Sequence, residues 1–238
     1  MNKETIPSNT FSDLKYKYVY RTPAIEAICE DKSVLNLGCL CHSNWEQQIQ
    51  NRTWLHGNLC NVASSIVGID YLTEDIGRLQ TKYGYEVLLG DVMNLDNVNT
   101  DKTFDVIVCG ELIEHIENPG LMLSGIKRFC HSKSIVVFTT PNPWWLRRCN
   151  LFFAQREQYK LNPEHVMYYS YWTLKALMER MGYQETIYGY YGAELEPYQA
   201  SKLRQLFSKA LIHITPQSMQ RGLFFVATPT LNNTQDDG

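Results

Sequence analysis

Short apolar runs alternate with amphipathic stretches along most of the chain after residue 30. The runs that predict β-strands are 33–37, 65–69, 86–89, 104–109, 134–139, 184–191 and 223–228. The stretches with helical spacing are 54–64, 73–83, 119–130, 170–181 and 198–213. Strands and helices that alternate this often are typical of a mostly parallel sheet with helices on both faces, which is an α/β fold.

Helix boundaries are marked at two places by local sequence. Asn118 precedes Pro119, and this pair predicts an N-cap followed by proline in the first turn. Ser170 predicts another N-cap, and Gly182 is expected to end the helix that follows. These signals support the two helices between the fourth and the sixth predicted strands.

The alternation also predicts the organisation of the chain. We expect a helical cap segment at 1–30, one α/β domain at 31–229 and a flexible tail at 230–238. Within the domain, residues 141–169 interrupt the alternation with prolines and with aromatic and basic side chains that include Trp144, Trp145 and Arg147. We interpret this segment as a lid inserted after the fifth strand, above the sheet.

Composition excludes several classes of protein. The 238 residues are 44% apolar, enough for one substantial core, and the net charge of −3 fits neither a disordered polyelectrolyte nor a strongly basic nucleic-acid binder. No apolar run approaches the roughly 20 residues of a membrane span, and residues 1–15 lack the apolar centre of an export signal. A cytoplasmic protein is expected, in which the seven scattered cysteines are reduced thiols.

Polar and glycine residues follow the first four predicted strands. Ligands of parallel sheets bind beyond the carboxyl ends of the strands, so these residues are candidates for a shared site. A carboxylate such as Asp70 can accept both hydroxyls of a ribose, and Asp91 could accept an adenine amine. Asp70 follows Gly38 by 32 residues, whereas a dinucleotide-binding motif places its acid about 20 residues on, so a dinucleotide cofactor is disfavoured.

Five segments, in order, resemble the motifs of class I S-adenosylmethionine (SAM)-dependent methyltransferases over about residues 30–229. They read VLNLGC, VGIDY, LLGDVMNLD, FDVIVCGELIEHIENP and IVVFTTPNP. The resemblance implies a Rossmann-like, seven-stranded methyltransferase sheet whose last strand is antiparallel. It also implies SAM as cofactor, with Gly38 near the methionine moiety, Asp70 on the ribose and Asp91 near the adenine. The other cofactor contacts expected on this basis are Cys39, Leu40, Tyr71, Val92 and Glu111.

The loop after the first strand departs from the family pattern. The family usually carries three alternating glycines there, and this chain has Gly38, Leu40 and His42 at those positions, with Asn36 where an acid is common. We expect the side chains of Leu40 and His42 to narrow the space that the backbone leaves for a ligand. For His42 and His56, packing or loop hydrogen bonds are favoured over catalysis.

Glu111, Glu114 and His115 form a second candidate group. If a helical turn starts at Glu111, the three side chains share one face. The ExxEH pattern is similar to that of ubiquinone-pathway O-methyltransferases and small-RNA 3′-end 2′-O-methyltransferases, in which it binds a divalent metal together with a later histidine, here His165. The resemblance implies magnesium or manganese on Glu111, Glu114, His115 and His165, lowering the pKa of a substrate hydroxyl. The alternative is a metal-free site in which His115 and Glu114 act on the acceptor directly.

The acceptor is expected to be a small molecule. Aromatic and basic groups of the lid suit a sugar, a nucleotide or an anionic aromatic metabolite, or they simply pack the lid onto the sheet. We favour O-methylation of a hydroxyl on a small molecule or a glycan or lipid precursor. The alternatives are 2′-O-methylation of an RNA 3′ end, N-methylation, and a non-catalytic methyltransferase-like binding module. RNA is the weaker partner because one short basic cluster gives little electrostatic attraction.

Overall fold

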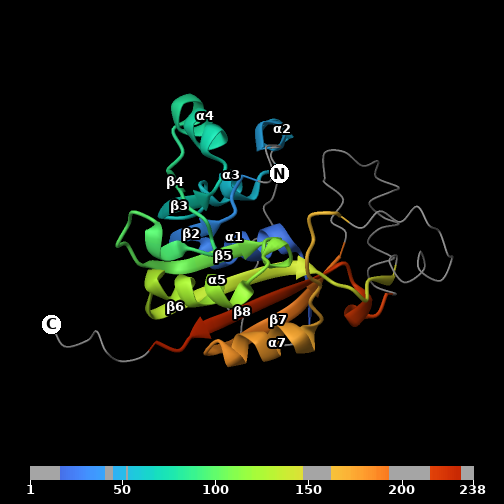
Figure 1. Cartoon of the computed structure of the whole chain (residues 1–238). Helices are drawn as coiled ribbons and strands as arrows, with labels where there is room; N and C mark the ends of the chain where they lie inside the picture. The colour runs from blue at the N-terminus through green and yellow to red at the C-terminus, as the bar shows by residue number, and fades with distance from the viewer. Residues whose placement is uncertain (1–16, 41–44, 52, 147–161, 193–214, 232–238) are drawn as a thin grey trace.

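The fold is built on one mixed β-sheet of eight strands (Figure 1). The computed structural model describes residues 17–40, 45–51, 53–146, 162–192 and 215–231. The strands are β1 (Lys17–Val19), β2 (Ser33–Leu37), β3 (Ser65–Asp70), β4 (Val87–Leu89), β5 (Phe104–Gly110), β6 (Cys130–Pro141), β7 (Tyr183–Tyr191) and β8 (Gly222–Pro229). All seven predicted strands are present, so the predicted α/β class is confirmed.

The order of the strands is β1-β7-β8-β6-β5-β2-β3-β4. Strands β4, β3, β2, β5 and β6 are parallel to one another, and β8 runs antiparallel to both β6 and β7. The antiparallel last strand implied by the family resemblance is therefore confirmed. Strand β1 was not predicted, and it adds an eighth strand by pairing in parallel with β7 at one edge.

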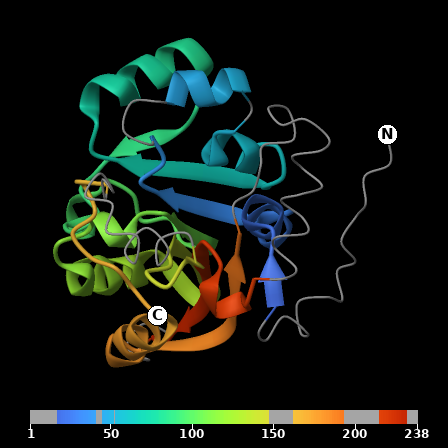
Figure 2. The ribbon, with the colours of Figure 1, turned by 90° about the vertical axis from the view of Figure 1, so that its right-hand side faces the viewer.

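Helices cover both faces of this sheet. They are α1 (Arg21–Cys29), α2 (Trp45–Asn51), α3 (Leu55–Leu59), α4 (Thr73–Tyr83), α5 (Pro119–Ile126) and α7 (Tyr171–Arg180), with short 3₁₀ turns η1 (Leu95–Asn97), η2 (Ile113–His115), η3 (Lys127–Phe129) and η4 (Gln217–Met219). Helices α5 and α7 lie on one face, and α1 and α3 lie on the other (Figures 1 and 2). Helices on both faces protect a parallel sheet from water.

The central strands are buried on both sides for this reason. On β2, Val34 belongs to the apolar cluster beneath α1 and α3, and its neighbour Leu35 belongs to the cluster beneath α5 and α7. Both side chains are 0% exposed. Successive side chains of a strand point to opposite faces, so a continuous apolar run is what a strand covered twice requires.

The predicted helices differ in how well they match the structure. Helix α4 has the predicted bounds, and both predicted caps are present, because Asn118 accepts from Leu121 N–H and Ser170 forms a capping box with Thr173. The predicted helix at 54–64 is shortened to α3, and α2 was not predicted. The helix predicted at 198–213, residues 147–161 of the predicted lid and most of the predicted tail lie outside the described residues.

The segment before α7 is attached to the loop that follows β5. Residues 162–170, here called the returning arm, include the last part of the predicted lid and lead into α7. The backbone N–H groups of Val166 and Met167 donate to Glu114 O at 3.0 and 3.1 Å. The arm is thereby attached to turn η2 beside the sheet.

None of the helices in the described ranges combines the length and the apolar character that a bilayer crossing requires.

Candidate active site

A cavity of about 790 Å³ opens at the carboxyl ends of β2 to β5. The loops that follow these strands line it, as the topology of a parallel sheet requires. Of the eight residues predicted to contact the cofactor, seven line this cavity, namely Gly38, Cys39, Asp70, Tyr71, Asp91, Val92 and Glu111. The cavity also contains the second candidate group, because Glu114, His115 and His165 line it as well. Both predicted groups therefore belong to one site.

Gly38 begins the cavity floor directly after β2. Its φ of +65° lies in the left-handed region, which favours glycine. A Cβ on Gly38 would lie 2.7 Å from Cδ1 of Leu112, itself a lining residue. Glycine is therefore required here both by the backbone conformation and by the close approach of Leu112.

Leu40 does not line the cavity, which corrects the expectation that it contacts the cofactor and narrows the site. It is 0% exposed and belongs to an apolar cluster with Trp45, Trp54 and Leu79. Its backbone N–H donates to Asp70 Oδ2 at 2.9 Å. The side chain points into the helical layer because apolar side chains of α2 and α4 meet it there. His42 lies outside the described residues.

Asp70, at the end of β3, is held by three backbone N–H groups. Oδ2 accepts from Leu40, and Oδ1 accepts from Tyr71 at 2.8 Å and from Leu72 at 3.3 Å. The side chain is 5% exposed yet reaches the cavity. Each carboxylate oxygen can accept more than one hydrogen bond, so Asp70 is oriented by the backbone and keeps acceptor capacity for a ligand.

Glu111, at the end of β5, is oriented differently from what a helical turn predicts. Its φ of +56° is left-handed, and its backbone N–H donates to the Thr139 carbonyl at 2.8 Å. One carboxylate oxygen accepts a short hydrogen bond from the Tyr191 hydroxyl. Burial and the neighbouring Glu111 carboxylate raise the pKa of Tyr191 well above its ordinary value, so the hydroxyl stays protonated as a donor. Glu111 is thus hydrogen-bonded to Tyr191 and is not one of the residues whose potential ligand atoms cluster, although its charge still acts on Glu114.

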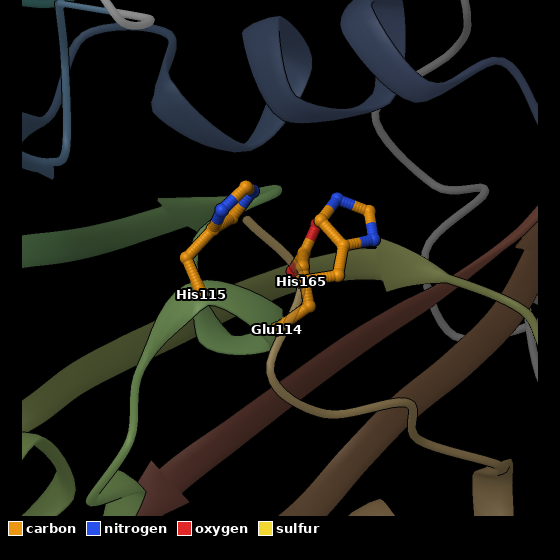
Figure 3. A group of neighbouring side chains, drawn as sticks. All are labelled: Glu114, His115 and His165. Atoms are coloured by element: carbon orange, nitrogen blue, oxygen red, sulfur yellow. The ribbon is translucent and has the colours of Figure 1, made fainter. Parts of the chain in front are cut away.

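Glu114, His115 and His165 converge at one end of the cavity (Figure 3). One potential ligand atom from each lies within 4.8 Å of the others, and the two imidazole rings meet edge to face with centroids 4.6 Å apart. Glu114 and His115 come from turn η2, and His165 comes from the returning arm. The sequence predicted these three as a group. They meet because the arm is bonded to η2, and not because residues 111–115 form one helical face.

Glu114 is the most deeply buried member of this trio. It is 0% exposed, Oε2 accepts from Thr140 Oγ1 at 3.0 Å, and Oε1 has no hydrogen-bond partner within the described part of the chain. Burial, followed by the charge of Glu111, raises the pKa of Glu114 to about 8. Burying a carboxylate costs free energy unless a cation or hydrogen bonds compensate it. A carboxylate and two imidazoles are a donor set that suits a divalent transition metal, so the residues fit such an ion.

Arg21 and Asn162 are among the lining residues that were not identified from the sequence. Arg21, at the start of α1, donates from Nε to Thr139 Oγ1 at 2.9 Å and supplies the only Arg or Lys side chain among the described lining residues. Its guanidinium lies over Gly110, where a Cβ would come within 2.8 Å of it. Asn162 of the returning arm also lines the cavity. Neither residue belongs to a motif, so no local signal marks them.

His56 lies behind the site, as the sequence analysis expected for a packing residue. It is 1% exposed, and burial lowers its pKa to about 4. Its ring packs against those of Trp54 and Tyr85. Its Nδ1 lies 3.2 Å from the Asn36 amide nitrogen, and Asn36 lines the cavity. His56 therefore touches the site only through another side chain.

Solved structures with this fold include several methyltransferases. A SAM-dependent methyltransferase from Archaeoglobus fulgidus is 17% identical, with a TM-score of 0.53 over 87% of this chain and 93% of that one. A possible histamine N-methyltransferase from Thermotoga maritima is 12% identical, with a TM-score of 0.56 over 88% and 87%. Magnesium protoporphyrin IX methyltransferase from Synechocystis PCC 6803, with bound S-adenosylhomocysteine (SAH), is 12% identical, with a TM-score of 0.53 over 88% and 82%.

Comparison by sequence gives a match at the level of the family. No curated protein matches the chain. The sequence model of the methyltransferase domain family matches residues 16–186, which include β1 to β6 and α7. This protein thus belongs to the methyltransferase domain family, and by family and fold it is a SAM-dependent methyltransferase.

Proposed function

We propose that this methyltransferase transfers the methyl group of SAM to a hydroxyl oxygen of a small molecule or of a glycan or lipid precursor. The convergence of Glu114, His115 and His165 at one end of the cavity carries this proposal. Their position beside the predicted cofactor residues suits a group that prepares an acceptor for attack on the methyl carbon. The ExxEH pattern, which resembles that of known O-methyltransferases, supports oxygen as the acceptor atom.

The cofactor would occupy the part of the cavity lined by the strand ends. Asp70 offers carboxylate oxygens to the ribose, while Asp91, Tyr71 and Val92 lie after the adjacent strands, where an adenine would bind. Gly38 leaves room for the methionine moiety. Methyl transfer from a sulfonium needs no covalent intermediate, so these residues bind and orient.

We also propose that Glu114, His115 and His165 hold a divalent metal. Oε1 of the buried Glu114 carboxylate has no hydrogen-bond partner within the described residues, and this observation supports the proposal. When bound, such an ion would lower the pKa of a coordinated hydroxyl. Because two of the three donors are imidazoles, manganese suits the set better than magnesium, which prefers oxygen donors.

The proton of the acceptor hydroxyl must leave during transfer. In the metal-free alternative, His115 is half-buried beside Glu114 and His165 and can receive this proton on a ring nitrogen. The returning arm, which carries His165, covers this end of the cavity and helps to keep water from the reacting atoms. The acceptor is thus held between the arm and the cofactor.

Calorimetric titration tests the cofactor and metal together. SAM and SAH are titrated into metal-free protein and into protein with manganese or magnesium, and an acceptor screen of hydroxylated metabolites follows. Replacement Glu114→Gln should abolish metal binding, whereas Glu117→Gln, which alters an exposed lining carboxylate, should leave it unchanged. Full activity in chelator would refute the metal, and a product methylated on nitrogen would refute the oxygen assignment.

A further inference from the structure

Asn36 and His56 form a buried pair beneath the loop that follows β2. Asn36 is 3% exposed and His56 is 1% exposed, and Asn36 Nδ2 lies 3.2 Å from His56 Nδ1. With the amide in this orientation Nδ2 donates, and the imidazole accepts at Nδ1 in the tautomer that carries its proton on Nε2. In that tautomer the hydrogen bond holds the Asn36 amide in one of its two orientations.

The His56 ring is held where it can act in this way. The centroid of the His56 ring lies 5.1 Å from that of Trp54 and 6.0 Å from that of Tyr85, and the Trp54 and Tyr85 centroids are 5.0 Å apart. Gly68 on β3 makes room for the ring, because a Cβ there would lie 3.1 Å from His56 Cε1. His56 Nε2 has no hydrogen-bond partner in the described part of the chain, so its side-chain hydrogen bonding there is devoted to Asn36.

Asn36 is also one of the residues that line the cavity. It lines the cavity together with Gly38 and Arg21, at the end where the methionine moiety of SAM is proposed to bind. Because Nδ2 is directed to His56, the carbonyl oxygen Oδ1 is the amide atom left to meet a ligand. An acid is common at this position in related methyltransferases, and its two oxygens are equivalent acceptors. An amide rotated by half a turn would instead present hydrogen-bond donors.

We propose that His56 is a positioning residue, which holds the Asn36 amide so that Oδ1 accepts a hydrogen bond from the ammonium group of the methionine moiety. This inference rests on the proposed placement of SAM in the cavity. A rotated amide would direct its N–H groups at the ammonium, and donor would face donor. A neutral side chain can therefore replace the acid only if a second residue fixes its orientation, which is what the buried imidazole does.

Replacement of His56 tests this with two ligands. His56→Phe keeps a ring between Trp54 and Tyr85 and removes the acceptor Nδ1. Binding of SAH should weaken about tenfold, the range expected for one hydrogen bond to a charged group. Binding of 5′-methylthioadenosine, which lacks the amino-acid moiety, should stay within twofold. In His56→Phe, KM for SAM should rise while kcat stays unchanged. His56→Gln, whose carbonyl can accept from Asn36, should restore SAH binding.

A second experiment, in a variant of Asn36, distinguishes a positioning role of His56 from a packing role. In Asn36→Asp protein, whose two carboxylate oxygens need no orientation, the further change His56→Phe should alter SAH affinity by less than about threefold. Equal weakening of SAH and 5′-methylthioadenosine, or equal weakening in both backgrounds, would show that His56 only packs beneath the loop and would overturn the inference. Failure of the wild-type protein to bind SAH would instead refute the proposed cofactor site.

Discussion

The Tyr191 hydroxyl, at the end of β7, donates a hydrogen bond to the carboxylate of Glu111, at the end of β5. Two strands separate these residues in the sheet, and 80 residues separate them in the sequence. The bond fixes the Glu111 side chain in the cavity wall while its backbone adopts a left-handed conformation. The antiparallel end of the sheet thereby helps to shape a site that is otherwise built from the parallel strands.

Tyr191→Phe should destabilise the protein by about 2 kcal/mol, because a hydrogen bond to a charged group is lost from a buried position. We also expect weaker SAH binding, since the freed Glu111 carboxylate can turn within the cavity. Urea unfolding and calorimetry measure the two effects. Tyr190→Phe is the matched control, because the Tyr190 hydroxyl makes no hydrogen bond with the described residues. Equal effects of both replacements would show that the Tyr191 bond contributes nothing specific.

Leu40→Gly makes the loop more like the usual family motif, and the sequence alone predicts that it improves cofactor binding. The structure instead predicts that this replacement destabilises the protein and does not improve cofactor binding. Leu40 is fully buried in the cluster with Trp45 and Trp54, so its removal should cost about 3 kcal/mol of unfolding free energy. SAH affinity should not increase, because the side chain does not line the cavity.

Leu40→Ala leaves a void in the apolar cluster without the added backbone freedom of glycine. Comparison of the two variants therefore separates the cost of the void from the cost of glycine. Thermal unfolding and SAH titration are measured on both variants. A gain in SAH affinity with unchanged stability would mean that Leu40 obstructs the ligand, as the sequence alone predicts.

The strand pattern and the site differ in how far sequence could predict them. The central strands β2, β3, β5 and β6 contain apolar runs because both faces of the sheet are covered, and that pattern is visible locally. Strand β1 has three residues and forms through pairing with β7, so nothing in its own sequence marks it. The strand-end residues were predictable for a topological reason, because parallel strands deliver their carboxyl ends to one edge.

The direction of each side chain at that edge is a tertiary property. Leu40 turns away from the cavity because α2 and α4 offer it an apolar cluster, and Glu111 turns towards Tyr191 through a left-handed φ. Neither effect has a signal in the residues nearby. Arg21 reaches the cavity from outside every motif. Sequence therefore predicted which loops form the site better than it predicted which atoms face a ligand.

Gly38→Ala should both destabilise the protein and reduce cofactor binding. A left-handed φ costs a non-glycine residue about 1–2 kcal/mol, and the new Cβ would also press on Leu112 at 2.7 Å. Since Leu112 lines the cavity, its displacement should weaken SAH binding at least tenfold.

Gly84→Ala is the control for the cost of the left-handed backbone conformation alone. Gly84 also has a left-handed φ, +72°, but a Cβ there would meet nothing within 4 Å. It should lose about 1 kcal/mol of stability and bind SAH normally. If Gly38→Ala behaves like Gly84→Ala in both measurements, the close approach of Leu112 has no part in shaping the cavity.

His56 should make stability depend on pH in the acid range. Its pKa is lowered by burial from 6.5 to about 4, so between these values the unfolded chain binds a proton that the folded protein excludes. The free energy of unfolding therefore has its full value above pH 6.5 and falls as the pH is lowered. At pH 4 the loss due to His56 is about 3 kcal/mol.

Unfolding free energies of wild type and His56→Phe, measured from pH 7 to pH 4, isolate this effect because the other titrating groups are common to both. The difference between the two proteins should shift in favour of His56→Phe by this amount as the pH falls. A difference that stays constant across the range would mean that water or a partner group stabilises protonated His56, and it would also remove the reason for treating the imidazole as a neutral acceptor towards Asn36.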